Sequence, residues 1–296
     1  MLAFYDLSIS PATYDITTFL TVAKGMARDA KQTLHVVFVP GPNGGFKNPT
    51  EETVRVKPLS IDEQKFRFDH ILLPACRAWG VTYTICVTRS DARAFKSDLV
   101  YPVGYDLEDN PTWGHTMSKA ISAHREGQSL VWAKPSKVAL KMVREHYPER
   151  PVVITLRETF HECSNSNIEN WLKVMEEIEY PLVVVRDTSR ATAPLPPYPT
   201  APLASLDLDY RLALYHHAMV NLTTTGGPPA LCWYSDLPYI SCRMHSEDRR
   251  VTSREYWNIM GMEIGDQFPW AKPNQKLVWG DEFELLDEWR EWKRSL

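Results

Sequence analysis

Residues 207–243 read DLDYRLALYHHAMVNLTTTGGPPALCWYSDLPYISCR, and this stretch decides the fold class. A helical pattern leads into a short buried strand that ends in a Gly-Gly-Pro-Pro turn, and a second helix and strand follow. A glycine-rich turn between a strand and a helix gathers backbone N–H groups and a positive helix end at one point. The stretch therefore predicts an anion site at the carboxyl end of a parallel strand, and with it a phosphate-bearing ligand.

The rest of the chain repeats the same alternation of strands and helices. Short apolar runs rich in β-branched residues are typical of parallel strands that are buried on both faces. The strand-like runs are 2–5, 34–39, 81–87, 130–132, 152–156, 182–185, 219–223 and 239–242. The helical patterns are 17–30, 62–79, 115–125, 136–146, 166–179, 207–218 and 253–260. This alternation predicts an α/β fold with right-handed crossovers.

The length of 296 residues suggests about two domains of 100–200 residues each. A polar, proline-bearing segment near 147–151 precedes the next buried strand, at 152–156. This pattern predicts an N-terminal domain 1–148 and a C-terminal domain 149–296. We expect two Rossmann-like domains that face a cleft. The amphipathic segment 282–293 carries aromatic residues at helical spacing and predicts a C-terminal helix. We expect this tail to cross between the domains or to form a dimer contact in a homo-oligomer.

Composition and charge exclude several classes of function. The net charge of −4 and the pI of about 6.2 give no basic field that would favour nucleic acid or an anionic membrane. No apolar run is long enough to span a membrane, and no signal peptide is evident, so we expect a cytoplasmic protein. The five cysteines form no CxxC, and we expect neither a disulfide framework nor a metal site. P-loop, GxGxxG, GxSxG and HExxH motifs are absent from the sequence.

Candidate donor-binding residues lie at predicted strand ends in the C-terminal half. Arg157 and Glu158 follow the strand 152–156, and an arginine there can bind phosphate through two hydrogen bonds. An alternative is an arginine–glutamate pair with a purely structural role. The second element of the site is the turn formed by Thr225, Gly226, Gly227 and Pro228. Its glycines allow positive φ and close approach, and the alternative is a tight structural turn that only lets the helix pack on the sheet.

Two further arginines are candidates for the same anion site. Arg211 lies near the start of the helical pattern 207–218, and Arg243 follows the strand 239–242. The acidic residues that open this helix are also favoured there by the helix dipole alone.

The N-terminal half offers carboxylates that could act as a base. Asp6 lies just past the first strand and Asp15 lies further along the same loop, where a general base would face a cleft. The loop PGPNGGF at 40–46 is expected to be mobile or to let backbones approach closely. The acceptor-side candidates are Tyr14, Asn43, Gly44 and Tyr105. An ordinary surface loop is the alternative interpretation for each of these segments.

The run AMVNLTTTGGPPALCWYSDLPYI resembles the nucleotide-sugar-binding half of GT-B glycosyltransferases. In that superfamily a glycine-containing turn before a helix receives the diphosphate, and a later strand follows a step like Leu237-Pro238-Tyr239-Ile240. The Arg157 segment is similar to the strand-end arginine of fucosyltransferase-like members, which meets the nucleotide phosphates. The resemblance covers mainly residues 151–243. It departs from the fucosyltransferase-like pattern in that LRET stands where His-x-Arg is common, and the chain is short for the superfamily.

The resemblance implies a metal-independent glycosyltransferase that moves a sugar from a nucleotide-sugar to a glycan or small-molecule acceptor. The C-terminal half would hold the donor, with Arg157, Arg211 and Arg243 neutralising the leaving phosphate. The N-terminal half would hold the acceptor, and no separate cofactor is implied. Two alternatives stay open: a sugar-nucleotide epimerase or hydrolase, and a non-catalytic scaffold of the same fold.

Overall fold

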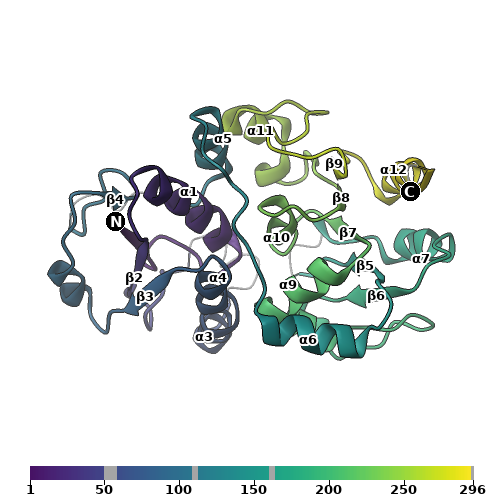
Figure 1. The fold of residues 1–296 in the computed structure, drawn as a ribbon, viewed down its shortest axis with the longest axis horizontal. Helices are drawn as coiled ribbons and strands as arrows, with labels where there is room; N and C mark the ends of the chain where they lie inside the picture. The colour runs from purple at the N-terminus through teal and green to yellow at the C-terminus, as the bar shows by residue number, and fades with distance from the viewer. Residues whose placement is uncertain (50–58, 109–112, 160–163, 295–296) are drawn as a thin grey trace. The chain divides into compact units, whose positions relative to one another are not determined.

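The computed structural model describes residues 1–49, 59–108, 113–159 and 164–294, and Figure 1 shows them as a ribbon. The chain divides into two compact units, Met1–Ala133 and Lys134–Leu296, and each is built around one sheet. Every named strand pair in both sheets is parallel. The predicted α/β fold with two Rossmann-like domains is thus confirmed.

The sheet of the first unit has the strand order β3-β2-β1-β4. Its strands are β1 (Leu2–Asp6), β2 (His35–Val39), β3 (Thr82–Ile85) and β4 (Val100–Tyr101). β1 pairs with β2 from Leu2↔His35 to Asp6↔Val39, so the carboxyl ends of the two central strands are level. Segments that follow these strands are therefore brought together at one edge of the sheet.

Helices and aromatic side chains cover both faces of this sheet. The helical elements are α1 (Asp15–Asp29), α3 (Ile61–Arg67), the π-helix η1 (Phe68–Leu72), α4 (Leu73–Ala78), the 3₁₀ turn η2 (Arg89–Ala94) and α5 (Met117–Arg125). Successive residues of a strand point to opposite faces. Tyr5 accordingly packs edge-on against Phe19 of α1 at 5.0 Å between ring centroids, whereas Phe4 stacks on Tyr105 at 4.8 Å.

The sheet of the second unit has the strand order β6-β5-β7-β8-β9. Its strands are β5 (Val152–Thr155), β6 (Leu182–Val185), β7 (Val220–Thr224), β8 (Tyr239–Cys242) and β9 (Gln275–Leu277). β5, β7 and β8 are buried at every residue, as parallel strands covered on both faces should be.

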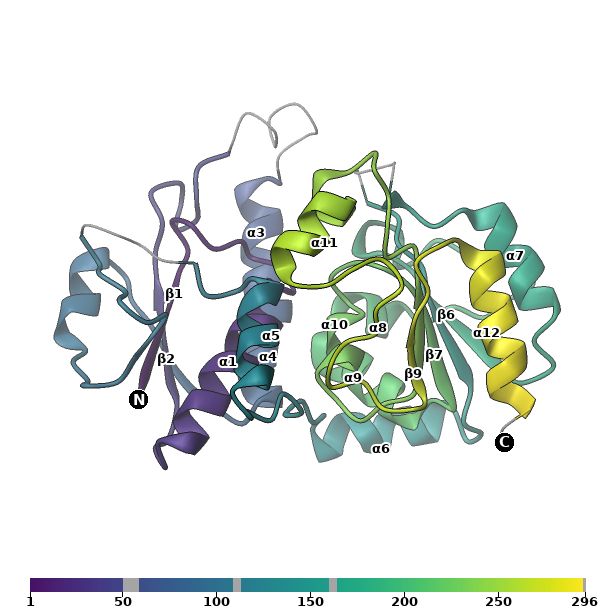
Figure 2. The same ribbon diagram turned by 90° about the horizontal axis from the view of Figure 1, so that it is seen from above.

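The helices of the second unit lie on both faces of its sheet (Figure 2). They are α6 (Lys137–His146), α7 (Ile168–Glu176), η4 (Thr188–Arg190), α8 (Pro202–Leu206), α9 (Leu208–His217), α10 (Ala230–Trp233), η5 (Arg250–Thr252), α11 (Arg254–Met260) and α12 (Glu282–Arg294). α7 and α12 contribute Trp171 and Trp289 to the core on one face. On the other face Tyr215 of α9 hydrogen bonds to Thr155 through its hydroxyl at 2.7 Å.

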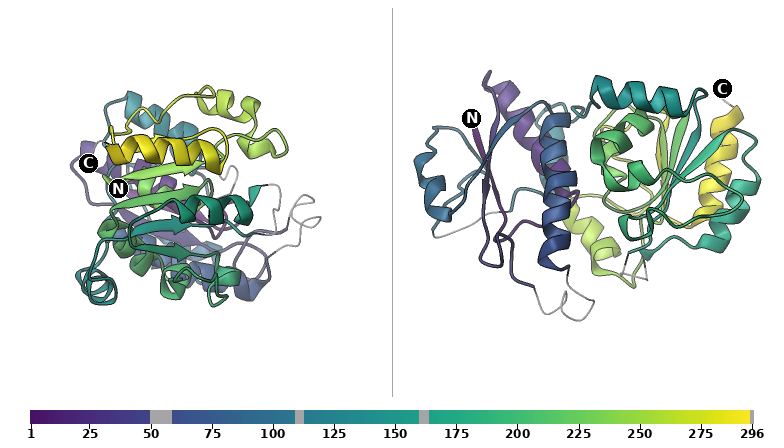
Figure 3. Two further views of the ribbon diagram at one scale, coloured as in Figure 1. Left: turned by 90° about the vertical axis from the view of Figure 1, so that its right-hand side faces the viewer. Right: turned by 90° about the horizontal axis from the view of Figure 1, so that it is seen from below.

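The C-terminal helix belongs to the second unit, which corrects the expected position between the domains. α12 packs against α7 and β8, as the left view of Figure 3 shows. Trp289 is buried in this contact, and Arg290 and Lys293 pair with Glu177 and Glu179 at 2.6 and 2.8 Å. The aromatic stripe that the sequence shows is the face that α12 presents to its own domain.

The units divide before α6, whereas the predicted boundary lies at 148/149. α6 packs on α9, and the contact includes a 2.8 Å hydrogen bond from the backbone N–H of Ser136 to Asp209. The predicted strand 130–132 is an irregular connection in the structure, and the short strands β4 and β9 were not predicted. A three-residue apolar run is too short to distinguish a strand from a connection.

The cysteines and the helices of the described residues show two further properties. Cys76, Cys86, Cys232 and Cys242 are buried free thiols, and Cys163 lies outside the described residues. In the part of the chain that the structure describes, no helix has both the length and the apolar character needed to cross a bilayer.

Candidate functional site

The carboxyl edge of the second sheet brings together four sequence segments, and three of them carry an arginine. Arg157 follows β5, Arg186 follows β6 and Arg243 follows β8. Between β5 and β8, β7 ends at Thr224 and continues into the turn 225–229. The parallel register brings these segments level, because Thr155 pairs with Thr223 and Thr224 pairs with Cys242. The structure thus places Arg157, Thr225 and Arg243 on successive strand ends.

Arg157 lies against the glycine-rich turn. Its Nη1 donates a 3.0 Å hydrogen bond to the carbonyl of Thr225. A Cβ atom on Gly226 would stand 3.2 Å from the same Nη1, which is tighter than ordinary van der Waals contact. Gly226 is therefore needed for the close approach of the guanidinium. Both residues are predicted members of the donor site, and the structure places them in contact.

The structure adds two details to the predicted turn. Gly226 and Gly227 do not take a positive φ, so their value here lies in the absence of a side chain. The helix that follows Pro228 and Pro229 is α10, which is a single turn of four residues. So short a helix has a small dipole, and the positive charge at this edge comes mainly from the arginine side chains.

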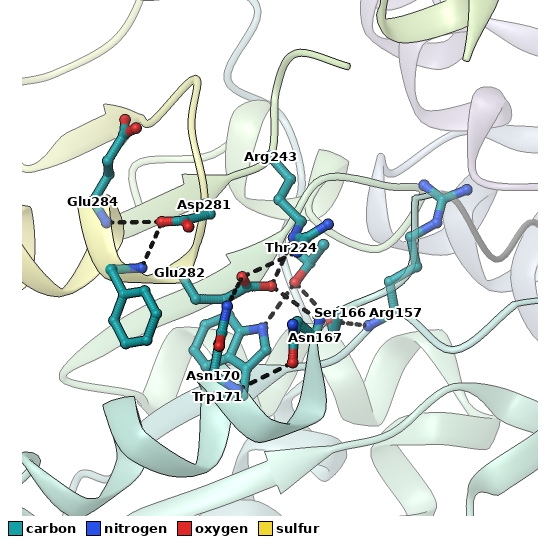
Figure 4. Close-up of polar contacts among 11 residues, drawn as sticks. Arg157, Ser166, Asn167, Asn170, Trp171, Thr224, Arg243, Asp281, Glu282 and Glu284 are labelled. Atoms are coloured by element: carbon teal, nitrogen blue, oxygen red, sulfur yellow. Dashed lines mark hydrogen bonds and ion pairs between the residues drawn. The ribbon is translucent and has the colours of Figure 1, made fainter. Parts of the chain in front are cut away.

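A buried network of hydroxyl groups lies beneath Arg157 (Figure 4). Ser166 Oγ accepts a 2.9 Å hydrogen bond from the backbone N–H of Arg157 and shares a 2.7 Å hydrogen bond with Thr224 Oγ1. Trp171 Nε1 of α7 donates to the same Thr224 oxygen at 3.1 Å. The network ties β7 and α7 to the segment that carries Arg157, and so fixes the backbone from which this arginine projects.

Arg243 is paired with a buried carboxylate from α12 (Figure 4). Its Nε and Nη2 donate to the two oxygens of Glu282 at 2.7 and 3.3 Å. Glu282 also accepts a 3.1 Å hydrogen bond from the backbone N–H of Asn167, the N-cap residue of α7. Burial alone would lower the pKa of Arg243, but the pair with Glu282 outweighs it and the pKa is raised.

The other two donor-side candidates have structural contacts. Glu158 forms a two-pronged ion pair with Arg186, and both side chains are nearly buried. Arg186 also donates to the carbonyls of Ala193 and Pro194 at 3.2 and 3.0 Å. Arg211 is buried in α9 and donates from Nε to the carbonyl of Ala204. Glu158 thus forms a structural ion pair with Arg186, an arginine that the alternative above did not name.

In the first unit, Asp6 and Tyr105 meet at the carboxyl edge of β1. The hydroxyl of Tyr105 donates a 2.8 Å hydrogen bond to Asp6, which also accepts from Arg89 and Ser8. Burial on its own would raise the pKa of Asp6, but these hydrogen bonds outweigh it and the pKa lies below its ordinary value. Both carboxylate oxygens are thus occupied by hydrogen bonds, and the Asp6 side chain is buried.

Asp15 is differently placed. It is exposed at the first position of α1, directly after the N-cap residue Tyr14. Thr13 Oγ1 donates a 2.9 Å hydrogen bond to one of its oxygens. An exposed carboxylate beside a hydroxyl group has the access that Asp6 lacks.

The loop that follows β2 is an ordered turn. Asn43 exchanges backbone hydrogen bonds with Phe46 at 2.8 and 2.9 Å, and Gly44 takes a φ of 57°. A Cβ atom on Gly41 would stand 2.4 Å from the carbonyl oxygen of Phe46 and 2.6 Å from that of Leu7. Of the two expectations for this loop, the structure shows the close approach of backbones.

Several residues of these networks were not identified from the sequence. They are Arg89, Arg186 and Glu282, and each acts through a partner that is distant along the chain. The one local signal is the arginine directly after the buried run 182–185, in a position like that of Arg157. The pairing partners themselves follow from the sheet topology.

No protein-family model and no curated protein sequence matches the chain. Among solved structures it is similar to the iron-containing dodecameric glycosyltransferase TibC from enterotoxigenic E. coli, with a TM-score of 0.51 and 12% identity over 99% of this chain and 76% of that chain. It is also similar to the E. coli heptosyltransferase WaaC with ADP-2-deoxy-2-fluoro heptose, with a TM-score of 0.50 and 11% identity over 100% of this chain and 99% of that chain. At this level of identity the likeness shows the fold, and the protein has the two-domain fold of GT-B glycosyltransferases that its sequence predicted.

Proposed function

We propose that this protein is a glycosyltransferase that moves a sugar from a nucleotide-sugar donor to a glycan or small-molecule acceptor. The observation that carries the proposal is the contact of Arg157 with the Thr225–Gly226 turn at the carboxyl edge of the second sheet. Ligands of open parallel sheets bind at this edge. The similarity to WaaC, whose structure holds an ADP-heptose analogue, makes ADP-sugars the first donors to try.

The chemistry of the site suits a leaving nucleoside diphosphate. As the glycosidic bond to the donor breaks, negative charge develops on the phosphate oxygens, and fixed donors that meet this charge lower the barrier. Arg157 supplies a planar guanidinium, which binds phosphate through paired hydrogen bonds. The transfer proposed here is metal-independent, since arginine takes the role of neutralising the leaving group.

Asp15 is the proposed base that removes a proton from the acceptor hydroxyl. It is exposed, is the first residue of α1 and comes after the first strand of the N-terminal unit. A carboxylate that accepts a proton from a bound hydroxyl must reach it directly or through one water. Asp6 is less suited to this role, because its oxygens are taken by Arg89, Ser8 and Tyr105.

The first test is ligand binding. A ligand that binds only the folded protein raises its Tm by mass action, with about 2.7 kcal/mol of stabilisation at one hundred times its Kd. We would measure Tm with ADP, UDP, GDP, TDP, CMP and their common sugars, with and without EDTA. We expect one nucleotide to raise Tm in EDTA as well. No shift with any nucleotide would overturn the proposal, and a shift that EDTA abolishes would overturn metal independence.

The second test locates the binding site by isothermal titration calorimetry with the nucleotide found. Arg157→Ala removes the guanidinium, and Gly226→Val places a side chain where it now lies. We expect each to weaken binding about tenfold or more, the loss of at least one hydrogen bond to a charged group. Arg144→Ala, an exposed arginine of α6, is the matched control. Unchanged binding in both variants would show that the site lies elsewhere.

The alternatives are separated by product analysis with donor alone. An epimerase or a hydrolase converts the nucleotide-sugar without an acceptor, whereas a glycosyltransferase requires one for efficient turnover. Chromatography of the donor after incubation therefore distinguishes the classes. Rapid conversion in the absence of any acceptor would contradict the proposed transfer reaction.

A further inference from the structure

Glu282 is a carboxylate with no access to solvent, held among groups that carry positive charge. Its side chain is 0% exposed, and its oxygens face Arg243 at 2.7 and 3.3 Å. The backbone N–H of Asn167 donates to it at the positive end of α7, and Asn170 Nδ2 lies at 3.5 Å. A buried charge is tolerated only where such partners compensate its desolvation. Glu282 therefore holds Arg243 in a defined position.

The backbone at Arg243 is strained in the way that functional positions often are. Arg243 has a φ of 57°, in the left-handed region that glycine takes without cost. Its N–H donates a 2.7 Å hydrogen bond to the carbonyl of Gly280, two residues before Glu282. An arginine in this conformation places its guanidinium beside Glu282. Such strain persists only where surrounding contacts fix the backbone. Here the hydrogen bonds of the Arg243 N–H to Gly280 and of the Thr225 N–H to the Cys242 carbonyl do so.

The pair with Glu282 uses only part of the hydrogen-bonding capacity of the Arg243 guanidinium. Nε and Nη2 bind Glu282, and within the described residues Nη1 makes no hydrogen bond. The side chain is 28% exposed, whereas its partner is fully buried. Arg243 directly follows Cys242, whose carbonyl accepts the N–H of Thr225 at 2.9 Å. The remaining donor therefore lies at the strand end next to the turn that contacts Arg157.

We propose that Glu282 is a positioning residue that aims Arg243 at the diphosphate of the donor, so that the start of α12 is part of the donor site. This inference rests on the proposed function, because it needs an anionic ligand at this edge of the sheet. Glu282 itself does not touch the ligand. It acts by fixing the guanidinium, whose free Nη1 supplies a second cationic contact beside Arg157.

A positioning role and a purely electrostatic role of Glu282 predict opposite changes in ligand affinity for the Glu282→Gln variant. If Glu282 only adds negative charge near the anion, Glu282→Gln removes repulsion and tightens binding. If it orients Arg243, the variant loosens the guanidinium and weakens binding. An amide oxygen can still accept from Asn167, so the helix start keeps one partner. The sign of the change in Kd therefore separates the two roles.

The experiment is titration calorimetry with pyrophosphate and with the nucleotide that raises Tm in the wild-type protein. For Glu282→Gln we expect binding about tenfold weaker for both ligands, the loss of one charge-assisted hydrogen bond. Glu284→Gln removes the same charge from an exposed residue two positions along α12 and is the matched control. Glu282→Asp keeps a carboxylate, and we expect it to recover part of the lost affinity for pyrophosphate.

The outcomes are distinct. Unchanged or tighter binding in a folded Glu282→Gln protein would overturn the positioning role, even where its Tm is lower. If that variant does not fold, Glu282→Asp decides: wild-type affinity with the shorter side chain would overturn the role, and binding weaker than that of the wild type in a folded Glu282→Asp protein would support it. Failure of the wild-type protein to bind any nucleotide or pyrophosphate would instead overturn the donor site as a whole.

Discussion

Asp6 and Arg89 form a two-pronged ion pair at the carboxyl edge of the first sheet. Nη1 of Arg89 lies 2.8 Å from Oδ1 of Asp6, and Nη2 lies 2.9 Å from Oδ2. The same guanidinium donates to the carbonyls of Pro40 and Leu107 at 3.2 and 3.0 Å. These residues come from the segments at the ends of β1, β2, β3 and β4. One arginine therefore joins all four strand ends of the sheet.

Replacing Asp6 by asparagine should destabilise the protein. The change leaves Arg89 and Tyr105 without their charged acceptor, and a lost hydrogen bond to a charged group costs on the order of 2 kcal/mol. Because the Arg89 side chain is 35% exposed, water can solvate it in part, and a larger loss is not expected. Urea unfolding at pH 7 measures the change. Asp29→Asn, in an exposed pair with Arg28, is the control and should change stability little.

The contribution of Asp6 should depend on pH with a definite sign. Its pKa is lower in the folded protein than the ordinary value of about 3.9. A lowered carboxyl pKa gives stability that is fully present above the unfolded value and is lost as pH falls through the folded value. We expect the stability difference between wild type and Asp6→Asn to be constant from pH 7 to 5 and to shrink below about pH 4. A difference that stays constant down to pH 3 would contradict this assignment.

Glu158 should matter for stability and little for donor binding. It pairs with Arg186 through both oxygens, in a site where the two side chains are 12% and 8% exposed. Breaking a pair of this kind costs about 3 kcal/mol, because the remaining charge is left without compensation. Glu158→Gln should therefore lower the free energy of unfolding while nucleotide affinity is kept. The exposed Glu149→Gln serves as control, and a selective loss of nucleotide affinity in Glu158→Gln would restore Glu158 to the binding site.

Thr224 and Thr223 offer a matched pair on one strand. Both are buried, but Thr224 joins Ser166 and Trp171 beneath Arg157, whereas Thr223 hydrogen bonds to Ser241 at 2.7 Å. Valine is similar in shape and leaves the partners unsatisfied, which costs about 1–3 kcal/mol at either position. Only Thr224→Val should also weaken nucleotide binding, since Ser166 holds the backbone of Arg157. Equal affinities in the two variants would show that this network does not support the site.

The sequence predicted the fold well because its signals are local. The runs 182–185 and 239–242 coincide with β6 and β8, since buried parallel strands are continuous apolar segments. β4 and β9 escaped prediction because strands of two or three residues carry no periodicity. The aromatic stripe of α12 predicted a helix but not its partner, because an apolar face does not specify what covers it.

Prediction of the site was less complete for a related reason. Ligands bind at the carboxyl ends of parallel strands, and this expectation led to Arg157, Gly226 and Arg243. These residues lie close together because their strands are neighbours in the parallel sheet. Whether an acidic residue is free or paired depends on distant arginines, as Asp6 with Arg89 illustrates. Sequence spacing carries no information about such pairs, which is why Asp6 and Asp15 looked equivalent before the structure separated them.

The difference in burial between Asp6 and Asp15 leads to a test of the proposed base. Asp15 is exposed and Asp6 is buried in an ion pair, so only Asp15 can approach an acceptor without breaking the fold. With a donor and acceptor identified, Asp15→Asn should lower kcat by about 10²–10⁴-fold, the usual contribution of a positioned base. Its Tm and nucleotide Kd should match those of the wild type, because the changed atoms lie at the surface and outside the unit proposed to bind the donor.

The control for this variant is Asp29→Asn at the other end of the same helix, which should retain full kcat. A loss of less than tenfold in Asp15→Asn, with wild-type stability, would remove it as the base. Of the two carboxylates that the sequence predicted, Asp6 would then remain, and its use would require Arg89 to release it. In that case Arg89→Lys, which keeps the charge but cannot form the two-pronged pair, should raise rather than lower the rate.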